Sequence, residues 1–308
     1  MTAASTAPAR WRPARPNWEM VAGLGILGVV VIVALAAPVI APYSPTAIHP
    51  DAILAGPSSH YLLGTDDLGR DVLSRLIFGT RTSLAIGSVS ALIGAVVGVP
   101  VGLWAGYHQG WAGNVTMRVV DVLLGFPGII IIMVISLVVQ RNLSAIVVAI
   151  GFLLSPIFVR VARAVTISER EKGYVEAIRS LGARTRYILL NAVLRNGVGP
   201  LMVQLALAVA NAILLEAGLS FLGLGVQPPT PSWGLMIQEG SSYLATSPLM
   251  SIAPGIGLVI VVLALNLSAD SIARRRPRMT TGRGPASEQI LPGLAASGPQ
   301  LETPVAAE

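Results

Sequence analysis

The residues best suited to interact with another molecule lie in one charged stretch, residues 173–196, between two long apolar stretches. Its first half has the i, i+3, i+4, i+7 spacing of a helix with one apolar face, at Tyr174, Ala177, Ile178 and Leu181. Ser168, ahead of Glu169 and Glu171, is typical of a helix start. Gly182 is suited to the left-handed conformation that ends a helix, and a second amphipathic stretch covers residues 184–194. The pattern predicts a helical hairpin that lies either in a partner's groove or on lipid headgroups, and the residue types leave both interpretations open.

A second group of candidate residues follows Glu216, which precedes a stretch rich in proline and glycine, residues 217–240. An acidic side chain inside an apolar span indicates either a functional site or a carboxylate that hydrogen-bonds to a neighbouring helix. With Ser220 and Trp233, Glu216 is therefore a candidate site residue. The irregular stretch itself predicts a compact external loop or re-entrant turn.

A third group comprises three carboxylates, Asp66, Asp67 and Asp71, before an amphipathic stretch that includes Leu68, Val72 and Leu76. They suit a helix N-terminus better than general acid–base catalysis or a cation site.

Other chemistry is excluded by residue type. The chain has no cysteine, and its only lysine, Lys172, is not part of a phosphate-binding G-x-x-x-x-G-K-[ST] loop. Three scattered histidines lack metal-ligand spacing, and no G-x-S-x-G motif occurs. We therefore predict no enzyme, no metal site and no cofactor bound by this chain.

The composition places these candidates in a membrane. Only 12% of the 308 residues are charged and 53% are hydrophobic, whereas soluble proteins carry about 25% charged residues. Uncharged windows long enough to cross about 30 Å of hydrocarbon cover residues 20–41, 82–107, 122–140, 142–159, 197–215 and 241–269. The sequence predicts an all-α integral membrane protein with six transmembrane helices.

Arginine placement predicts the orientation. Basic residues precede the first span, follow the last span and fill the loop after the fourth, so the positive-inside rule puts both termini and the hairpin in the cytoplasm. This distribution also accounts for the net charge of +6 without nucleic acid. The first span could instead be a signal peptide, but its apolar core exceeds the usual length of about 7–15 residues, which favours a retained helix.

Span two carries glycines at four-residue intervals, Gly94, Gly98, Gly102 and Gly106. A bare helix face lets another helix backbone approach closely, so tight packing is favoured over a moving gate surface. We expect this helix in the interior or at a subunit seam.

Several motifs together resemble a known family. Glu176-Ala177, followed by Gly182, resembles the E-A-A-x-x-x-G coupling loop of permeases of ATP-binding cassette (ABC) importers. The stretches that begin at Leu63 (LGTDDLGRDVLSR), Arg118 (RVVDVLLGFP) and Glu216 (EAGLSFLGLGVQPPTPSWG) look like the dipeptide/oligopeptide/nickel permeases, C-type subunit. The chain departs from the pattern at Ile178, where alanine is usual, and at Arg195, where proline is common.

The resemblance implies a type I importer permease in a bacterial plasma membrane, in contact with membrane lipid. Its partners would be a homologous B-type permease, two cytoplasmic ATPases that hold ATP and Mg²⁺, and an extracytoplasmic substrate-binding protein. Short peptides would be the cargo, with nickel chelates, glutathione or opines as alternatives. The residues implied to contact the ATPase are Glu176, Ala177, Ile178, Leu181, Gly182, Ala183 and Arg186. The candidates for the translocation pathway or an outer gate are Glu216, Ser220 and Trp233. A channel or ion-coupled secondary transporter is the alternative class, disfavoured because neither rings of pore-lining charges nor internal repeats are evident.

These expectations divide the chain into five parts. They are a cytoplasmic segment (1–19), a first transmembrane helix (20–41), an extracytoplasmic segment with an amphipathic helix (42–81), a five-helix ABC transmembrane type-1 domain (82–273) and a disordered cytoplasmic tail (280–308). The type-1 domain would include a coupling loop at about 165–196 and an external loop at about 217–240.

Overall fold

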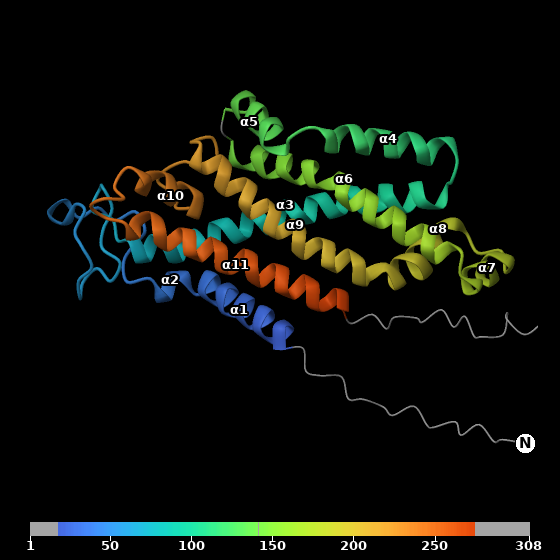
Figure 1. Cartoon of the computed structure of the whole chain (residues 1–308), viewed down its shortest axis with the longest axis horizontal. Coiled ribbons are helices and arrows are strands. Elements are labelled where there is room, and N and C mark those ends of the chain that lie inside the picture. Colours follow the sequence, from blue (N-terminus) through green and yellow to red (C-terminus); the bar gives the residue numbers. More distant parts are fainter. Residues whose placement is uncertain (1–17, 141, 275–308) are drawn as a thin grey trace, which may run out of the picture. The chain divides into compact units, whose positions relative to one another are not determined.

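The computed structural model describes residues 18–140 and 142–274, so the predicted tail and most of the N-terminal segment lie outside the described residues. Within these ranges the regular structure is helical (Figure 1). The helices are α1 Trp18–Leu35, α2 Ala37–Ile40, the short 3₁₀ helix Pro50–Ala52, α3 Val72–Tyr107, α4 Trp111–Gly125, α5 Gly128–Val138, α6 Leu143–Arg170, α7 Gly173–Ser180, α8 Thr185–Tyr187, the π-helix Ile188–Leu194, α9 Arg195–Phe221, α10 Trp233–Ser241 and α11 Leu249–Arg274.

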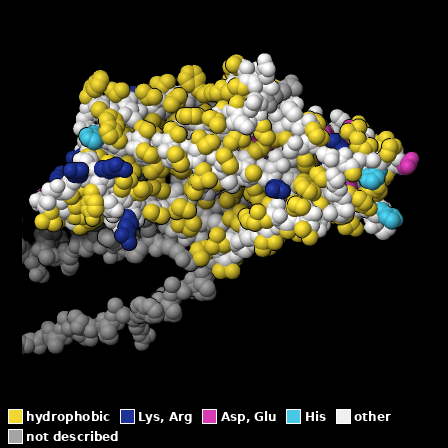
Figure 2. All heavy atoms as spheres, turned by 180° about the vertical axis from the view of Figure 1, so that it is seen from behind, with side chains coloured by type: hydrophobic (Ala, Val, Ile, Leu, Met, Phe, Trp, Pro, Cys, Tyr) yellow, Lys and Arg dark blue, Asp and Glu magenta, His cyan; other side chains and the backbone are white. Residues whose placement is uncertain are grey.

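Among the described residues, five helices are long and apolar enough to cross a membrane: α1, α3, α6, the continuous helix Thr185–Phe221, and α11. A sixth span exists if α4 and α5, which meet at an angle of 82°, count as one. Hydrophobic side chains cover much of the face drawn in Figure 2, and basic side chains gather near one end. The prediction of an all-helical membrane protein with six apolar segments is confirmed.

The third span is broken, where the sequence predicted one helix over residues 122–140. The break lies at Phe126, which is extended (φ −93°, ψ 138°) and precedes Pro127, the N-cap of α5. A proline disfavours the helical conformation of the residue before it, which ends α4 at this point. Arg160 of α6 ion-pairs with Asp121 of α4 across 2.7 Å and so ties α4 to the bundle.

Helix α3 begins ten residues before the predicted second span, because the predicted external amphipathic helix is its first part. Asp71 caps it, with Oδ2 accepting from the Ser74 backbone N–H at 2.8 Å. Leu68 lies in the preceding turn rather than on the helix. With 36 residues the helix is about 54 Å long, which exceeds the bilayer core by about 24 Å. Its ends therefore extend beyond the hydrocarbon.

The glycine ladder packs against α6 of the same chain. A Cβ added to Gly98 would lie 2.4 Å from the backbone oxygen of Ser155, and one added to Gly102 would lie 2.4 Å from the oxygen of Val159. Gly94 and Gly106 approach α6 in the same way. This intimate contact places α3 in the interior, as the core around which α6, α9, α1 and α11 pack.

The last span begins at Leu249, eight residues later than predicted, since Trp233–Ser241 forms the separate helix α10. Ser232 caps α10 by accepting from the Leu235 N–H, and Pro248 precedes α11. At the far end of α11, Arg274 ion-pairs with Glu19 at the start of α1. The first and last spans are thus joined by an ion pair as well as by packing.

Candidate functional site

The predicted helical hairpin lies at the end of the bundle where α6 stops (Figure 1). Helix α6 continues to Arg170, so Ser168 and Glu169 belong to its last turn, and the prediction that a helix starts at Ser168 is wrong. The next helix, α7, starts at Gly173 with Lys172 as its N-cap residue. The buried face of α6 continues through Ala162, Thr166 and Glu169. Because its last turns are polar, the residue types alone gave the wrong boundary.

The hairpin has a buried side and an exposed side. Val175, which the predicted apolar face did not include, is fully buried, and Ile178 packs against the same cluster with Leu103, Ala162 and Ile188. The i, i+3 spacing of Val175 and Ile178 was the available signal. Five predicted contact residues are exposed instead, namely Glu176, Ala177, Leu181, Gly182 and Arg186. Leu181 is 87% exposed, although it is a large apolar residue.

Gly182 makes the turn that reverses the chain after α7. Its φ is +79°, the left-handed region, and its N–H donates to the carbonyl of Arg179 at 2.9 Å. The Ala183 N–H donates back to Ile178 O at 3.4 Å, which completes a Schellman-type ending. A Cβ added to Gly182 would meet nothing within 4 Å. Backbone conformation, not space, therefore favours glycine here.

Two sets of contacts hold the hairpin to the bundle. At the end of α3, Tyr107 accepts from Arg170 through its carbonyl at 2.6 Å, and its ring lies 5.5 Å from the Arg179 guanidinium carbon. Between α6 and α9, Glu169 accepts from the Tyr174 hydroxyl at 2.7 Å, and Asn196 Nδ2 donates to the same hydroxyl at 2.9 Å. Burial, then the hydrogen bond to Glu169, raises the pKa of Tyr174, which keeps the phenol a neutral donor. These contacts connect α7 with α3, α6 and α9.

The second predicted amphipathic stretch is a different structure from the one expected. Residues 185–187 form one α turn, and Ile188–Leu194 form a π-helix that continues directly into α9. Ile188, Ala192 and Val193 are buried against the bundle, while Tyr187 and Leu190 are exposed. Such π-helical segments are rare in proteins, and those that occur are frequently found at functional sites.

Glu216, Ser220 and Trp233 lie together at the other end of the bundle, and all three are buried. Glu216 accepts from the Ser220 hydroxyl at 2.7 Å and from the Ser83 hydroxyl at 3.3 Å. Ser83 also accepts from the Trp233 backbone N–H at 3.3 Å, and the Trp233 indole donates to Leu76 O at 3.3 Å. The cluster therefore joins α3, α9 and α10, and its carboxylate faces hydroxyl groups of its own chain.

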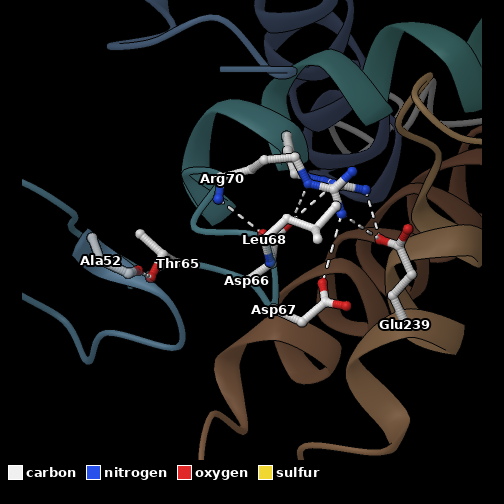
Figure 3. A network of polar contacts seen from close by, with 8 residues as sticks. Ala52, Thr65, Asp66, Asp67, Leu68, Arg70 and Glu239 are labelled. Atoms are coloured by element: carbon white, nitrogen blue, oxygen red, sulfur yellow. Dashed lines mark hydrogen bonds and ion pairs between the residues drawn. The ribbon is translucent and has the colours of Figure 1, made fainter. Parts of the chain in front are cut away.

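A network of buried charges joins the turn before α3 to α10 (Figure 3). Arg75, which is 1% exposed, donates to Asp66 at 2.8 Å and to Glu239 at 2.6 Å. Arg70 donates to Asp66 at 2.6 Å and lies 3.6 Å from Glu239. Burial raises the pKa of Glu239, while Arg75 and Arg70 oppose this shift. The carboxylates of Asp66 and Asp67 thus pair with arginine side chains. Within the described residues, no group of acids and histidines has the arrangement of a metal site.

We expect Arg75→Ala to lower the free energy of unfolding by about 3–5 kcal/mol, the cost of breaking a buried ion pair on one side. Glu239 would lose its hydrogen-bonded guanidinium, and the buried carboxylate of Asp66 would keep only that of Arg70. Thermal unfolding of the detergent-purified protein measures the effect. Arg81→Ala is the matched control, since Arg81 is exposed on the same helix and we expect a change within about 0.5 kcal/mol. Equal stability of the two variants would show that the network contributes nothing.

Comparison with protein families agrees with this arrangement of helices. The model for binding-protein-dependent transport system inner membrane components matches residues 98–278, more than half of the chain. The model for the N-terminal transmembrane domain of oligopeptide transport permease C matches residues 10–57. The chain belongs to the family of inner membrane components of binding-protein-dependent transport systems.

Individual relatives are similar over most of their length. The di/tripeptide transport system permease protein DppC of Pseudomonas aeruginosa is 39% identical over 268 residues, 85% of this chain and 88% of that protein. The glutathione transport system permease protein GsiD of Pectobacterium atrosepticum is 38% identical over 259 residues, 84% of this chain and 86% of that protein. The dipeptide transport system permease protein DppC of Haemophilus influenzae is 34% identical over 268 residues, 85% of this chain and 91% of that protein.

A solved structure supports the fold. An inward-facing MetNI methionine ABC transporter matches with a TM-score of 0.55 and 21% identity, over 66% of this chain and 96% of the matched chain. Together the comparisons confirm the resemblance to ABC importer permeases of the C type. The chain is a multi-pass permease subunit of the bacterial plasma membrane and functions in transport, not as an enzyme.

Proposed function

We propose that the exposed side of the hairpin docks on a cytoplasmic ATPase and transmits its movement to the membrane helices. The exposed apolar side chains of Leu181, Tyr187 and Leu190 carry this proposal. They lie where α7 and the π-helix leave the bundle, and exposed apolar groups rimmed by charges are typical of protein interaction sites. Arg179, Arg184 and Arg186 supply the charged rim.

Each residue of the proposed surface has a distinct part. Glu176, Ala177 and Leu181 face the ATPase, Gly182 and Ala183 set the turn, and Arg186 lies in the rim. Ile178 points toward the bundle, so its difference from the usual alanine alters the packing beneath the surface and not the surface itself. The basic residues at this end support a cytoplasmic position under the positive-inside rule. At the other end, Arg70 and Arg75 are paired with acids.

The remaining partners complete a transporter. A homologous B-type permease forms the pathway with this chain, two ATPases bind ATP and Mg²⁺, and an extracytoplasmic binding protein delivers the substrate. Hydrolysis takes place on the ATPases, because this chain lacks a phosphate-binding loop.

Glu216, Ser220 and Trp233 act at the outer gate as anchors. Their hydrogen bonds fasten α10 to α3 and α9, and a Cβ on Gly234 would lie 2.5 Å from Ala217 O. Because the cluster is buried, it positions the segment between α9 and α10 without touching the substrate itself.

The transported molecule is a short peptide. The similar proteins named above are named for dipeptide, di/tripeptide and glutathione transport, and glutathione is itself a small peptide. Nickel chelates and opines are the competing substrates.

Reconstitution of the complete complex in proteoliposomes tests the proposal. Uptake of radiolabelled dialanine and of glutathione is measured with ATP on the ATPase side, with ADP, and with a protonophore. We expect uptake that requires ATP and the ATPases and withstands the protonophore. Uptake by this chain without ATPases, driven by an ion gradient, would instead identify a secondary transporter.

A further inference from the structure

Helix α9 presents two amide side chains on one outward face within its membrane span. Gln204 is half-buried and Asn211 is exposed. Seven residues make about two helical turns, so the two side chains share a face and lie about 10 Å apart along the axis. Leu207 and Leu214 lie on the same face. Both amides fall inside the uncharged window 197–215.

Neither amide has a hydrogen-bond partner among the described residues. An amide that enters hydrocarbon unpaired costs about 4–8 kcal/mol, and the bilayer core offers no water. Two such groups on one helix face would make lipid contact costly. The face is better suited to water or to another polar molecule.

Helices α3 and α11 behave differently. The outward face of α11 exposes apolar residues, among them Ile252, Ile256, Val259 and Leu263, and that of α3 exposes Val89, Leu92 and Val96. Asn266, the amide of α11, donates to Val262 O of its own helix at 2.9 Å. The outward face of α9 is thus distinguished from faces that suit lipid.

We propose that the face of α9 with Gln204 and Asn211 lines the translocation pathway and hydrogen-bonds to the backbone of the transported peptide. A side-chain amide offers both donors and an acceptor, which complement the N–H and C=O groups that every peptide carries. Such contacts hold the backbone without regard to side-chain identity, which suits transport of peptides of varied sequence. The ligand assignment rests on the proposed peptide substrate, but the aqueous exposure of the face does not.

The absence of cysteine makes thiol labelling a direct test. Asn211→Cys and Gln204→Cys are each introduced singly, assembled into the full complex, and treated with a charged methanethiosulfonate that dissolves in water but not in hydrocarbon. Val259→Cys on α11, 62% exposed and apolar in its surroundings, is the control. Since the reagent attacks thiolate and a thiol in lipid stays protonated, we expect labelling at Asn211 or Gln204 to be at least about tenfold faster than at Val259.

Saturating dialanine should slow labelling at Asn211 and Gln204, and Asn211→Leu should lower uptake per ATP hydrolysed, with recovery in Asn211→Gln. The proposal is overturned if both thiols react as slowly as Val259→Cys, since the face would then lie against lipid or the second permease. Fast labelling that no peptide slows overturns the peptide contact. Absence of dialanine uptake in the unmodified complex contradicts the proposed substrate separately, because thiol accessibility is measured without transport.

Discussion

Gly98→Leu is expected to destabilise the folded chain strongly. Even a Cβ at this position would lie 2.4 Å from Ser155 O and 2.6 Å from the Phe158 Cβ, both on α6. Backbone oxygen cannot retreat as a flexible side chain can, so α3 and α6 must separate. We expect a loss of about 3 kcal/mol or more in the free energy of unfolding, the upper end of overpacking effects.

The yield of monodisperse protein and its thermal unfolding in detergent measure this loss. Gly25→Leu is the matched control, because Gly25 also lies in a span, in α1, and a Cβ there meets nothing within 4 Å. We expect its stability to stay within about 0.5 kcal/mol of the parent. Similar behaviour of the two variants would mean that the glycine ladder is not a close packing surface.

Gly182→Val is expected to leave the permease folded but to reduce ATP-driven uptake at least about tenfold. The left-handed conformation costs a non-glycine residue about 1–3 kcal/mol, with β-branched residues at the upper end, and about 1.4 kcal/mol corresponds to a factor of ten. The hairpin would relieve this strain by changing its turn, which would displace Leu181 and Arg186 from the proposed docking surface. Uptake and ATP hydrolysis by the reconstituted complex are measured together.

Two controls separate conformation from bulk. Gly182→Asn should recover most of the uptake, because asparagine tolerates the left-handed region. Gly173→Val adds the same side chain in the same hairpin, also into open space but without a positive φ, and should stay within about twofold of the parent. If Gly182→Val transports as well as Gly173→Val does, the shape of the turn does not matter for coupling.

Features that depend on local pattern were predictable from the sequence. Runs of uncharged residues located the spans, the four-residue spacing located the ladder, and Gly182 marked the turn. The break at Phe126-Pro127 was also visible in principle, since a residue before proline avoids the helical region. It was missed because uniform hydropathy across the break suggested one continuous helix.

Contacts between distant segments were not predictable. Arg75 and Glu239 are separated by 164 positions, and each alone is typical of a solvated residue near a membrane surface. Likewise, the spacing of Val175 and Ile178 showed that they share a face of α7, but not that this face is the one packed against the cluster with Leu103 and Ala162. Only the folded arrangement determines that side.

The π-helix between the hairpin and α9 has a consequence for how force passes along this helix. A π turn spans one residue more than an α turn, so Ile188–Leu194 holds extra length within a continuous helix. Conversion of a π turn into α geometry would rotate everything on its N-terminal side by about 100° relative to α9. Displacement of the hairpin could therefore be accommodated by twisting of the helix rather than by bending or unfolding. In that case α9 would rotate about its own axis when the hairpin moves.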